Sequence, residues 1–295
     1  MASVSTKAVA VSGAAILAIG GLAYFAGLRA NGGGTKSSSA IIGEARTGSL
    51  TVDLPSAIAD IRITDAREPG RPIVLLDPGH GGRDPGATSA SGAYLEKNLA
   101  LAVAQELRTL LAERGRVRVA LTRDDDRYLT LEQRAAIARR IGAALFISLH
   151  MDSAPNPLAR GVTIYSLSDV ASSAEAANIA AAENRSGEAL SSDGDSSVRA
   201  ILSDLALRDQ MEDSAAFASR LVRRAAGPVM LRPRPHQFAD FHVLRRAETP
   251  AILVEGGYIS NADDEAMLST PRGRAPLVRA LAQTIEADIA ARRTR

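Results

Sequence analysis

Short apolar runs alternate with longer amphipathic segments over most of this chain. Runs of about four to six apolar residues, bounded by Gly, Pro or polar residues, predict buried strands. They occupy residues 73–77, 117–122, 144–149, 162–167 and 251–254. Helical patterns occupy residues 96–114, 131–141, 170–190, 198–226 and 277–293.

This alternation predicts the α/β class, a single domain with a mostly parallel central sheet flanked by helices, over residues 71–295. Two capping boxes, in which a hydroxyl and a later Glu or Gln satisfy the first backbone N–H groups of a helix, support the helix starts. The first is Thr130-x-x-Gln133, and the second is Ser172-x-x-Glu175 at the start of an Ala-rich helix.

The N-terminal segment differs from the rest. Residues 8–28 carry no charge and are flanked by Lys7 and Arg29. At ~1.5 Å per residue such a helix crosses the ~30 Å core of a bilayer. We therefore expect residues 1–30 to be a signal anchor or signal peptide that sends the chain out of the cytosol and into or through the membrane. Residues 31–70 begin Gly/Ser-rich and are expected to be a linker with short strands.

Composition narrows the chemistry further. The 295 residues contain no Cys, which excludes disulfides, thiolate catalysis and Cys-based zinc sites, and they contain only four His. The net charge is +2 and the acids are dispersed among the bases, so nucleic-acid binding is not indicated. Any metal must be held by His, Asp or Glu.

Candidate metal ligands stand where predicted strands end. His80 follows the first strand in DPGHGGRDPGA, His150 ends LFISLH, and Glu255 follows AILV. Because ligands gather beyond the carboxyl ends of strands in open α/β sheets, these side chains are expected on one rim. Glu96 stands at the start of the next helix. Two His and two Glu match a hydrolytic zinc centre with three protein ligands, an open water position and a general base.

Each residue also has a structural interpretation. His80 could serve the fold of a Gly-rich loop, Glu96 could interact with the helix dipole, and Asp152 could cap a loop rather than orient a ligand imidazole. Glu255 is the hardest to explain in this way, because an unpaired carboxylate at the end of a buried strand costs several kcal/mol.

The motifs DPGHGGRDPGA, TRDDDRYLTLEQRAAIAR, LFISLHMDS and TPAILVEGGYISNADDEAML resemble, in order and spacing, the zinc-dependent N-acetylmuramoyl-L-alanine amidases of bacterial cell-wall remodelling. This resemblance, over about residues 72–289, implies Zn²⁺ held by His80, Glu96 and His150, with Glu255 as the catalytic carboxylate. It implies peptidoglycan as substrate and a role in daughter-cell separation, in the periplasm. Alternatives are a zinc peptidase acting on wall stem peptides and a non-catalytic peptidoglycan-binding regulator.

The resemblance extends to regulation. Cell-division amidases of Gram-negative bacteria carry an inserted helix that covers the zinc until a LytM-type activator protein binds, and residues 171–190 look like that insertion. Glu175 and Glu183 lie about 80° apart around a helix, so both can face the same region. Either could fill the open metal position. Glu183 is slightly favoured, but the pattern does not decide between them, and a surface helix in an inserted loop is the alternative.

Overall fold

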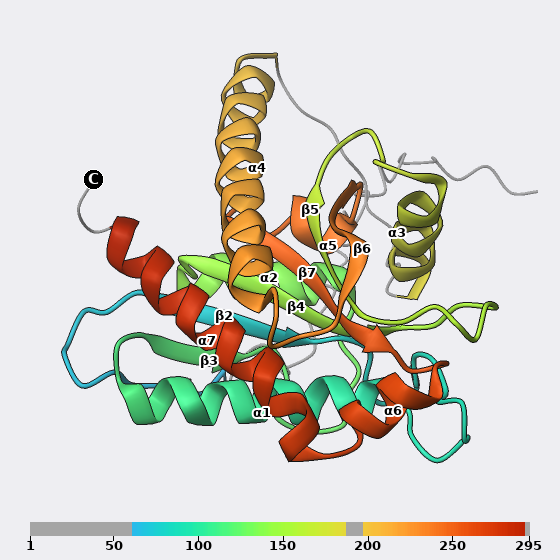
Figure 1. The fold of residues 1–295 in the computed structure, drawn as a ribbon. Helices are drawn as coiled ribbons and strands as arrows, with labels where there is room; N and C mark the ends of the chain where they lie inside the picture. The colour runs from blue at the N-terminus through green and yellow to red at the C-terminus, as the bar shows by residue number, and fades with distance from the viewer. Residues whose placement is uncertain (1–60, 187–196, 293–295) are drawn as a thin grey trace, which may run out of the picture. The chain divides into compact units, whose positions relative to one another are not determined.

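The computed structural model describes residues 61–186 and 197–292 (Figure 1). The expected membrane or signal segment, residues 1–30, lies outside these ranges, as do most of the linker and the end of the Ala-rich segment. Among the described helices, none is both long enough and apolar enough to cross a bilayer.

Seven strands form one sheet in the order β1-β3-β2-β4-β7-β5-β6. Their bounds are β1 Ile63–Thr64, β2 Ile73–Pro78, β3 Arg118–Leu121, β4 Leu145–Asp152, β5 Val162–Leu167, β6 Leu231–Ala239 and β7 Ala251–Tyr258. The helices are α1 Glu96–Arg114, α2 Leu131–Ile141, α3 Ala174–Ser186, α4 Ser197–Ala225, α5 His242–Arg245, α6 Ala262–Leu268 and α7 Pro271–Arg292.

The predicted mostly parallel sheet is present, with two antiparallel pairings. Strands β3, β2, β4 and β7 are parallel neighbours, whereas β5 runs antiparallel to β7 and parallel to β6. The carboxyl end of β5 therefore lies at the opposite edge from those of β2, β4 and β7. The short strand β1, within the expected linker, pairs antiparallel with β3.

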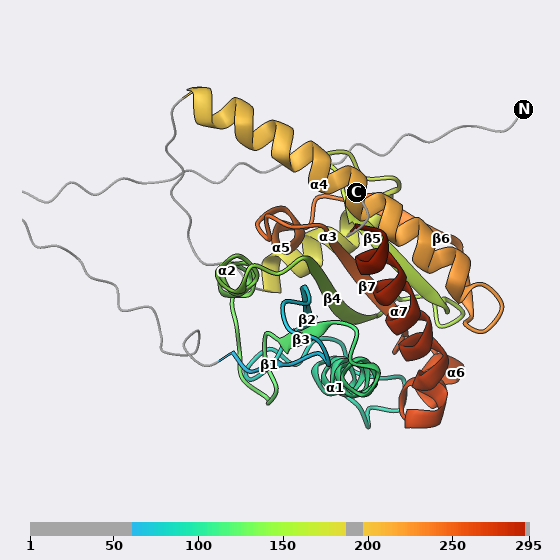
Figure 2. The same cartoon turned by 90° about the vertical axis from the view of Figure 1, so that its left-hand side faces the viewer.

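Helices cover both faces of the sheet (Figure 2). Successive residues of a strand point to opposite faces. Accordingly, Ile147 and Leu149 join the core beneath α1, α4 and α7, while Phe146 joins the core shared with α2, α3 and α5. His150 continues the alternation that begins at Phe146, so its side chain belongs to the α2–α3 side.

Helix and strand bounds test the hydrophobic pattern directly. Helices α1 and α2 begin and end at the predicted residues, and Thr130 and Gln133 form the expected capping box. Strand β6 was not predicted, because Pro233 and Pro235 lack the backbone N–H of a strand donor. Its place at the edge of the sheet accommodates them. The segment between the predicted helix at 198–226 and the predicted strand at 251–254 therefore contains a strand that the apolar pattern did not indicate.

The capping box of α2 predicts a measurable stability loss. The Thr130 side chain accepts a hydrogen bond from the backbone N–H of Gln133, so Thr130→Ala should lower the free energy of unfolding by about 1 kcal/mol. Urea unfolding of the full chain measures it. Thr109→Ala, at an exposed site on α1, is the control and should stay within about 0.5 kcal/mol of the parent. Equal midpoints for the parent and Thr130→Ala would show that the cap contributes nothing.

Candidate metal centre

The parallel strands β2, β4 and β7 deliver polar side chains to one edge of the sheet. His80 follows β2, while His150 on β4 pairs in register with Glu255 on β7. The three side chains are nearly inaccessible, at 6%, 5% and 2% exposure. The predicted convergence at the carboxyl ends of these strands is therefore present in the structure.

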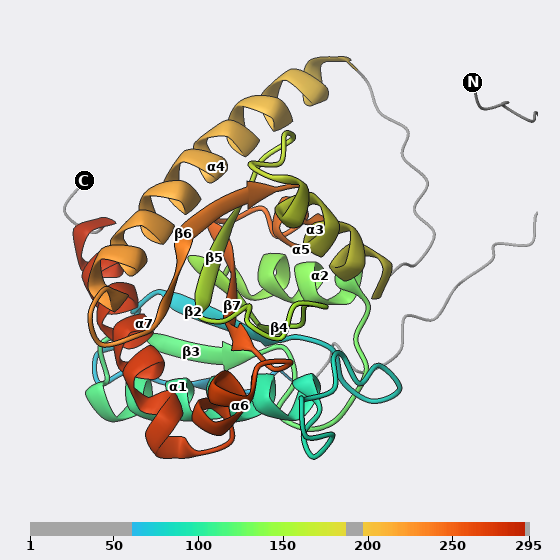
Figure 3. The ribbon, with the colours of Figure 1, turned by 45° about the vertical axis from the view of Figure 1, so that its right-hand side comes forward.

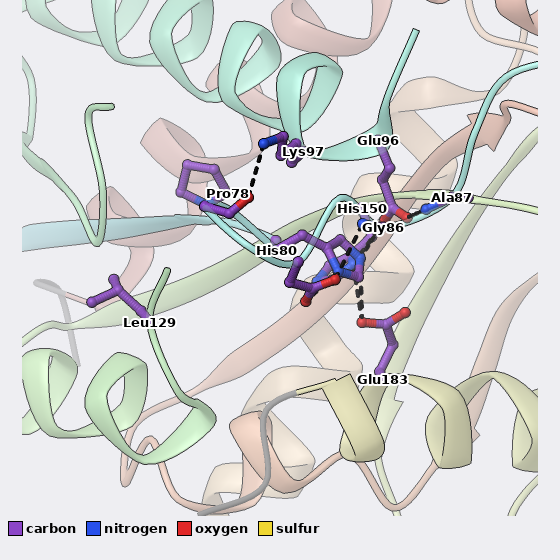
Figure 4. A network of polar contacts seen from close by, with 12 residues as sticks. Pro78, His80, Gly86, Ala87, Glu96, Lys97, Leu129, His150 and Glu183 are labelled. Atoms are coloured by element: carbon purple, nitrogen blue, oxygen red, sulfur yellow. Dashed lines mark hydrogen bonds and ion pairs between the residues drawn. The ribbon is translucent and has the colours of Figure 1, made fainter. Parts of the chain in front are cut away.

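Four side chains present their donor atoms to one point (Figure 4). Glu96 Oε1 lies 3.0 Å from both His80 Nε2 and His150 Nδ1. Glu183 Oε2, from α3, lies 3.2 Å from His150 Nδ1 and 3.7 Å from His80 Nε2. The donor atoms of all four lie within 4.8 Å of one another.

Backbone and side-chain groups fix the orientation of these donors. Glu96 accepts hydrogen bonds from the backbone N–H groups of Ala87 and Met151, at 2.9 and 3.0 Å. Asp84 lies 2.9 Å from Nδ1 of His80, which leaves Nε2 directed at the other donors. Sequence reasoning missed Asp84, although its position four residues after His80 in the Gly-rich loop was a usable signal.

Glycines make this close approach possible. A Cβ atom on Gly79 would lie 2.3 Å from the His150 ring. Gly86 has φ +65°, and a Cβ there would lie 2.6 Å from Glu96 Oε2 and 2.7 Å from the His80 ring. The glycines of DPGHGGRDPGA thus give the metal-site side chains the space that any larger residue would fill.

The cluster has an excess of negative charge. Burial alone would lower the pKa of His80, but Glu96, Asp84 and Glu183 raise it to about 11. Burial raises the pKa of Glu183, and it opposes the lowering of the Glu96 pKa by the two imidazoles. In the absence of a metal the site thus favours the uptake of protons, and a bound cation would supply the same positive charge.

The donor set fits zinc. Zinc binds imidazole nitrogen and carboxylate oxygen at ~2.0–2.2 Å in tetrahedral geometry, which places neighbouring ligand atoms roughly 3.3–3.6 Å apart. The four distances given above between a His nitrogen and a Glu oxygen, 3.0 to 3.7 Å, span that range, and all the donor atoms lie within 4.8 Å of one another. In addition, the buried His80 Nε2 has no hydrogen bond of acceptable geometry among the described residues. These residues could therefore hold the metal with little rearrangement.

Glu255 lies beside this group without belonging to it. Its Oε2 is buried and has no hydrogen-bond partner among the described residues. Burial, followed by the charge of Asp152, raises its pKa well above the ordinary value of a carboxyl group. A buried carboxyl whose pKa is raised in this way is typical of a general base or acid.

Asp152 has different partners from those expected. Its carboxylate accepts the backbone N–H of Ser153 at 2.7 Å and lies within hydrogen-bonding reach of the Tyr258 hydroxyl. Burial raises the pKa of Asp152 to about 7, although the Tyr258 contact lowers it. Beyond the four donor residues themselves, Asp84 is the described acid that bonds a cluster imidazole, and Asp152 makes no such bond among the described contacts.

The structure shows which of the two glutamates of α3 faces the donor cluster, a choice that the helical pattern left open. Glu183 faces the two imidazoles, whereas Glu175 pairs with Arg232 at 2.6 Å and accepts from the Tyr258 hydroxyl at 3.0 Å. The expected capping box of α3 is wrong, because Ser173 rather than Ser172 accepts the helical N–H, from Ala176. The Glu175 carboxylate bonds the Arg232 guanidinium and the Tyr258 hydroxyl instead.

A cleft of about 420 Å³ opens beside the cluster. His80, Glu96, Glu183 and Glu255 line it together with residues of the β4 end, and α3 supplies part of its wall. Figure 3 shows α3 beside the end of β6, on the same side of the sheet as α2 and α5. A substrate carbonyl that enters the cleft would meet the donor cluster and Glu255 on the same rim.

Comparisons with known proteins agree with this geometry. The family model described as N-acetylmuramoyl-L-alanine amidase (Amidase_3) matches residues 74–287. The N-acetylmuramoyl-L-alanine amidase AmiA of Escherichia coli K12 is 35% identical over 220 residues, covering 73% of this chain and 75% of that protein. The Salmonella typhimurium AmiA is 36% identical over 217 residues, covering 72% and 74%.

A solved structure shows the same architecture. The amidase AmiC2 of Nostoc punctiforme superposes with a TM-score of 0.53 at 25% identity, covering 77% of this chain and 99% of that one. The match of the family model and the identity to the AmiA proteins confirm the enzyme class that the motifs predicted. The chain belongs to the N-acetylmuramoyl-L-alanine amidase family.

Proposed function

We propose that this chain is a zinc enzyme that hydrolyses the amide between N-acetylmuramic acid and the L-alanine of the peptidoglycan stem peptide, for cell-wall remodelling and daughter-cell separation. One observation carries the zinc assignment. His80, Glu96 and His150 direct their donor atoms to one point within a negatively charged, Cys-free site. Family membership supports the substrate.

Zinc bound there would polarise the scissile carbonyl and lower the pKa of water toward ~7. The chain itself would handle the protons. Glu255, whose raised pKa makes its carboxylate a stronger base than an ordinary one, would accept a proton from the attacking water and pass it to the leaving amine nitrogen. Asp84 would keep His80 in the tautomer that directs Nε2 at the metal.

The position of α3 supports an autoinhibited state. Glu183 is placed where the fourth ligand of the metal, a water in an active enzyme, would bind. Of the described apolar residues of α3, Ala176 and Ala180 are fully buried and Ile179 is partly buried, so the docking of the helix is expected to be of marginal stability. We propose that Glu183 blocks the site and that undocking of α3 exposes it.

A partner that binds only the undocked form would shift the population toward activity. A LytM-type activator is the partner that we propose for this role. We also propose that the enzyme works in the cell envelope, on the periplasmic side. There, the uncharged residues 8–28 would hold it at the membrane or direct its secretion.

The products of peptidoglycan digestion test the proposed reaction. Purified sacculi incubated with the full chain should release free stem peptides that begin with L-alanine, together with glycan that lacks peptide. Mass spectrometry of the soluble products measures both. Shortened stem peptides that remain attached to glycan would identify a peptidase instead, and an absence of soluble products even from the zinc-loaded Glu183→Ala enzyme would indicate a binding protein.

Substitution of Glu255 tests the proton transfer. Glu255→Gln keeps the size of the side chain but cannot accept the proton, so turnover should fall by ~10² to 10⁴ with zinc content unchanged. Glu113→Gln, at an exposed site on α1, is the matched control and should keep parental turnover and zinc. Near-parental turnover by a zinc-loaded Glu255→Gln enzyme would refute the role.

Substitution of Glu183 tests the block. Glu183→Ala frees the fourth position and removes one anchor of α3, so basal hydrolysis of sacculi should rise by roughly tenfold, equivalent to ~1.4 kcal/mol in the docking equilibrium. Arg185→Ala, an exposed change on the same helix, should leave the basal rate unaltered. A folded, zinc-loaded Glu183→Ala enzyme with the parental basal rate would show that this carboxylate is not the block.

A further inference from the structure

We propose that Arg134, on α2, is a positioning residue that holds His80 in its metal-binding geometry by binding the backbone of the Pro78–His80 turn. The inference rests on the proposed metal centre. Neither α2 nor Arg134 contributes a donor atom to that centre. The link between them is a set of buried hydrogen bonds beneath the His80 loop.

The backbone of His80 requires such support. Its φ is +56°, in the left-handed region, and among the described residues only Glu248 shares a positive φ without being glycine. A residue with a Cβ reaches this conformation at an energetic cost and keeps it only when the surroundings enforce it. If the turn relaxed, Nε2 of His80 would move away from the donors of Glu96 and His150.

Arg134 holds the turn in this conformation through hydrogen bonds to its backbone. Its Nη2 donates to the carbonyl of His80 at 2.7 Å, and its Nη1 donates to the carbonyl of Pro78 at 2.7 Å. The same Nη1 bonds the carboxylate of Asp77 at 2.7 Å, and Nε donates to the carbonyl of Leu129 at 3.2 Å. One planar guanidinium thus bonds the backbone carbonyls on both sides of Gly79. Arg134 is buried, with 3% of the residue exposed.

Asp77 holds the guanidinium in place and ties the neighbouring strands together. Its Oδ1 accepts from Thr122 at 2.6 Å, and its Oδ2 accepts from Ser148 at 2.9 Å. Ser148 lies two residues before His150 on β4, on the same face of the strand. The network therefore connects the segments that carry both imidazoles.

A second buried arginine, Arg123, also bonds the backbone of the turn. It donates to the carbonyls of Pro78 and Gly79, at 3.0 and 2.6 Å, and to the carbonyl of Lys97 at 2.9 Å, next to Glu96. Burial and the nearby charge of Arg134 lower the pKa of Arg123 to about 10. Burying two guanidiniums this close to each other is unfavourable for packing alone, which favours a role in fixing the turn.

A lysine at position 134 cannot replace this fork. Lys carries one compact ammonium group, whereas the planar guanidinium presents separate donors to His80, Pro78 and Asp77 in fixed directions. Arg134→Lys keeps the positive charge beside Asp77 but cannot make all the hydrogen bonds to the turn. The substitution therefore tests the effect of these hydrogen bonds without removing the buried positive charge.

The zinc dissociation constant, measured on the full chain by competition with a chromogenic chelator, tests the inference. Arg134→Lys should bind zinc ~10- to 100-fold more weakly than the parent, as expected when a group that orients a ligand is lost. Arg139→Lys, on the same helix and partly exposed, should keep the parental constant. Ile289→Ala, a core truncation on α7, controls for general loss of stability and should also keep it.

Each outcome decides a separate point. Parental zinc affinity in Arg134→Lys would overturn the positioning role, and so would an equal loss in Ile289→Ala at matched stability. If Arg134→Lys fails to fold, Asp77→Asn replaces it, because it retains the hydrogen-bonding shape and removes the charge that fixes Nη1. Unweakened zinc binding there would also overturn the role. A parent that binds no zinc would instead overturn the metal centre itself.

Discussion

Charge compensation at the carboxyl ends of β2, β4 and β7 is the constraint on which the rest of the site depends. The carboxylates of Glu96, Glu183 and Asp84 surround the imidazoles of His80 and His150 within hydrogen-bonding distances, in a place that is almost closed to water. A cation held at the centre of such a cluster would compensate this charge. The same requirement explains why the donors come from separate segments, because no single helix or strand could direct so many charged groups to one point.

The fold supplies these segments and then restrains them. Parallel pairing brings His150 level with Glu255, and the turn after β2 brings His80 into the same rim. Backbone N–H groups of Ala87 and Met151 fix Glu96, so its position follows from the path of the chain rather than from side-chain packing. Helix α3 adds a further carboxylate, Glu183, whose Oε2 lies 3.2 Å from Nδ1 of His150. In the proposed autoinhibited state this carboxylate would occupy the position that the substrate must reach.

Much of this could be predicted from the sequence, for identifiable reasons. Helices α1 and α2 have long apolar periodicity and clear termini, and the strand ends marked His80, His150 and Glu255 as neighbours. The direction of β5 could not be predicted, because a strand buried on both faces carries no signal of its orientation. The choice between Glu183 and Glu175 depended on the packing angle of α3 and on Arg232, more than fifty residues away in the chain. Asp84 and Arg134 escaped notice because they act through other residues rather than on the metal.

The location of bound zinc tests the account most directly. Crystals of the zinc-loaded full chain, with diffraction collected on both sides of the zinc absorption edge, would give an anomalous difference map that shows the ion independently of any model. The account predicts one strong peak ~2.0–2.2 Å from His80 Nε2, Glu96 Oε1 and His150 Nδ1. A zinc peak held by other residues, or a peak at this site from which any of these three atoms is displaced, would contradict it.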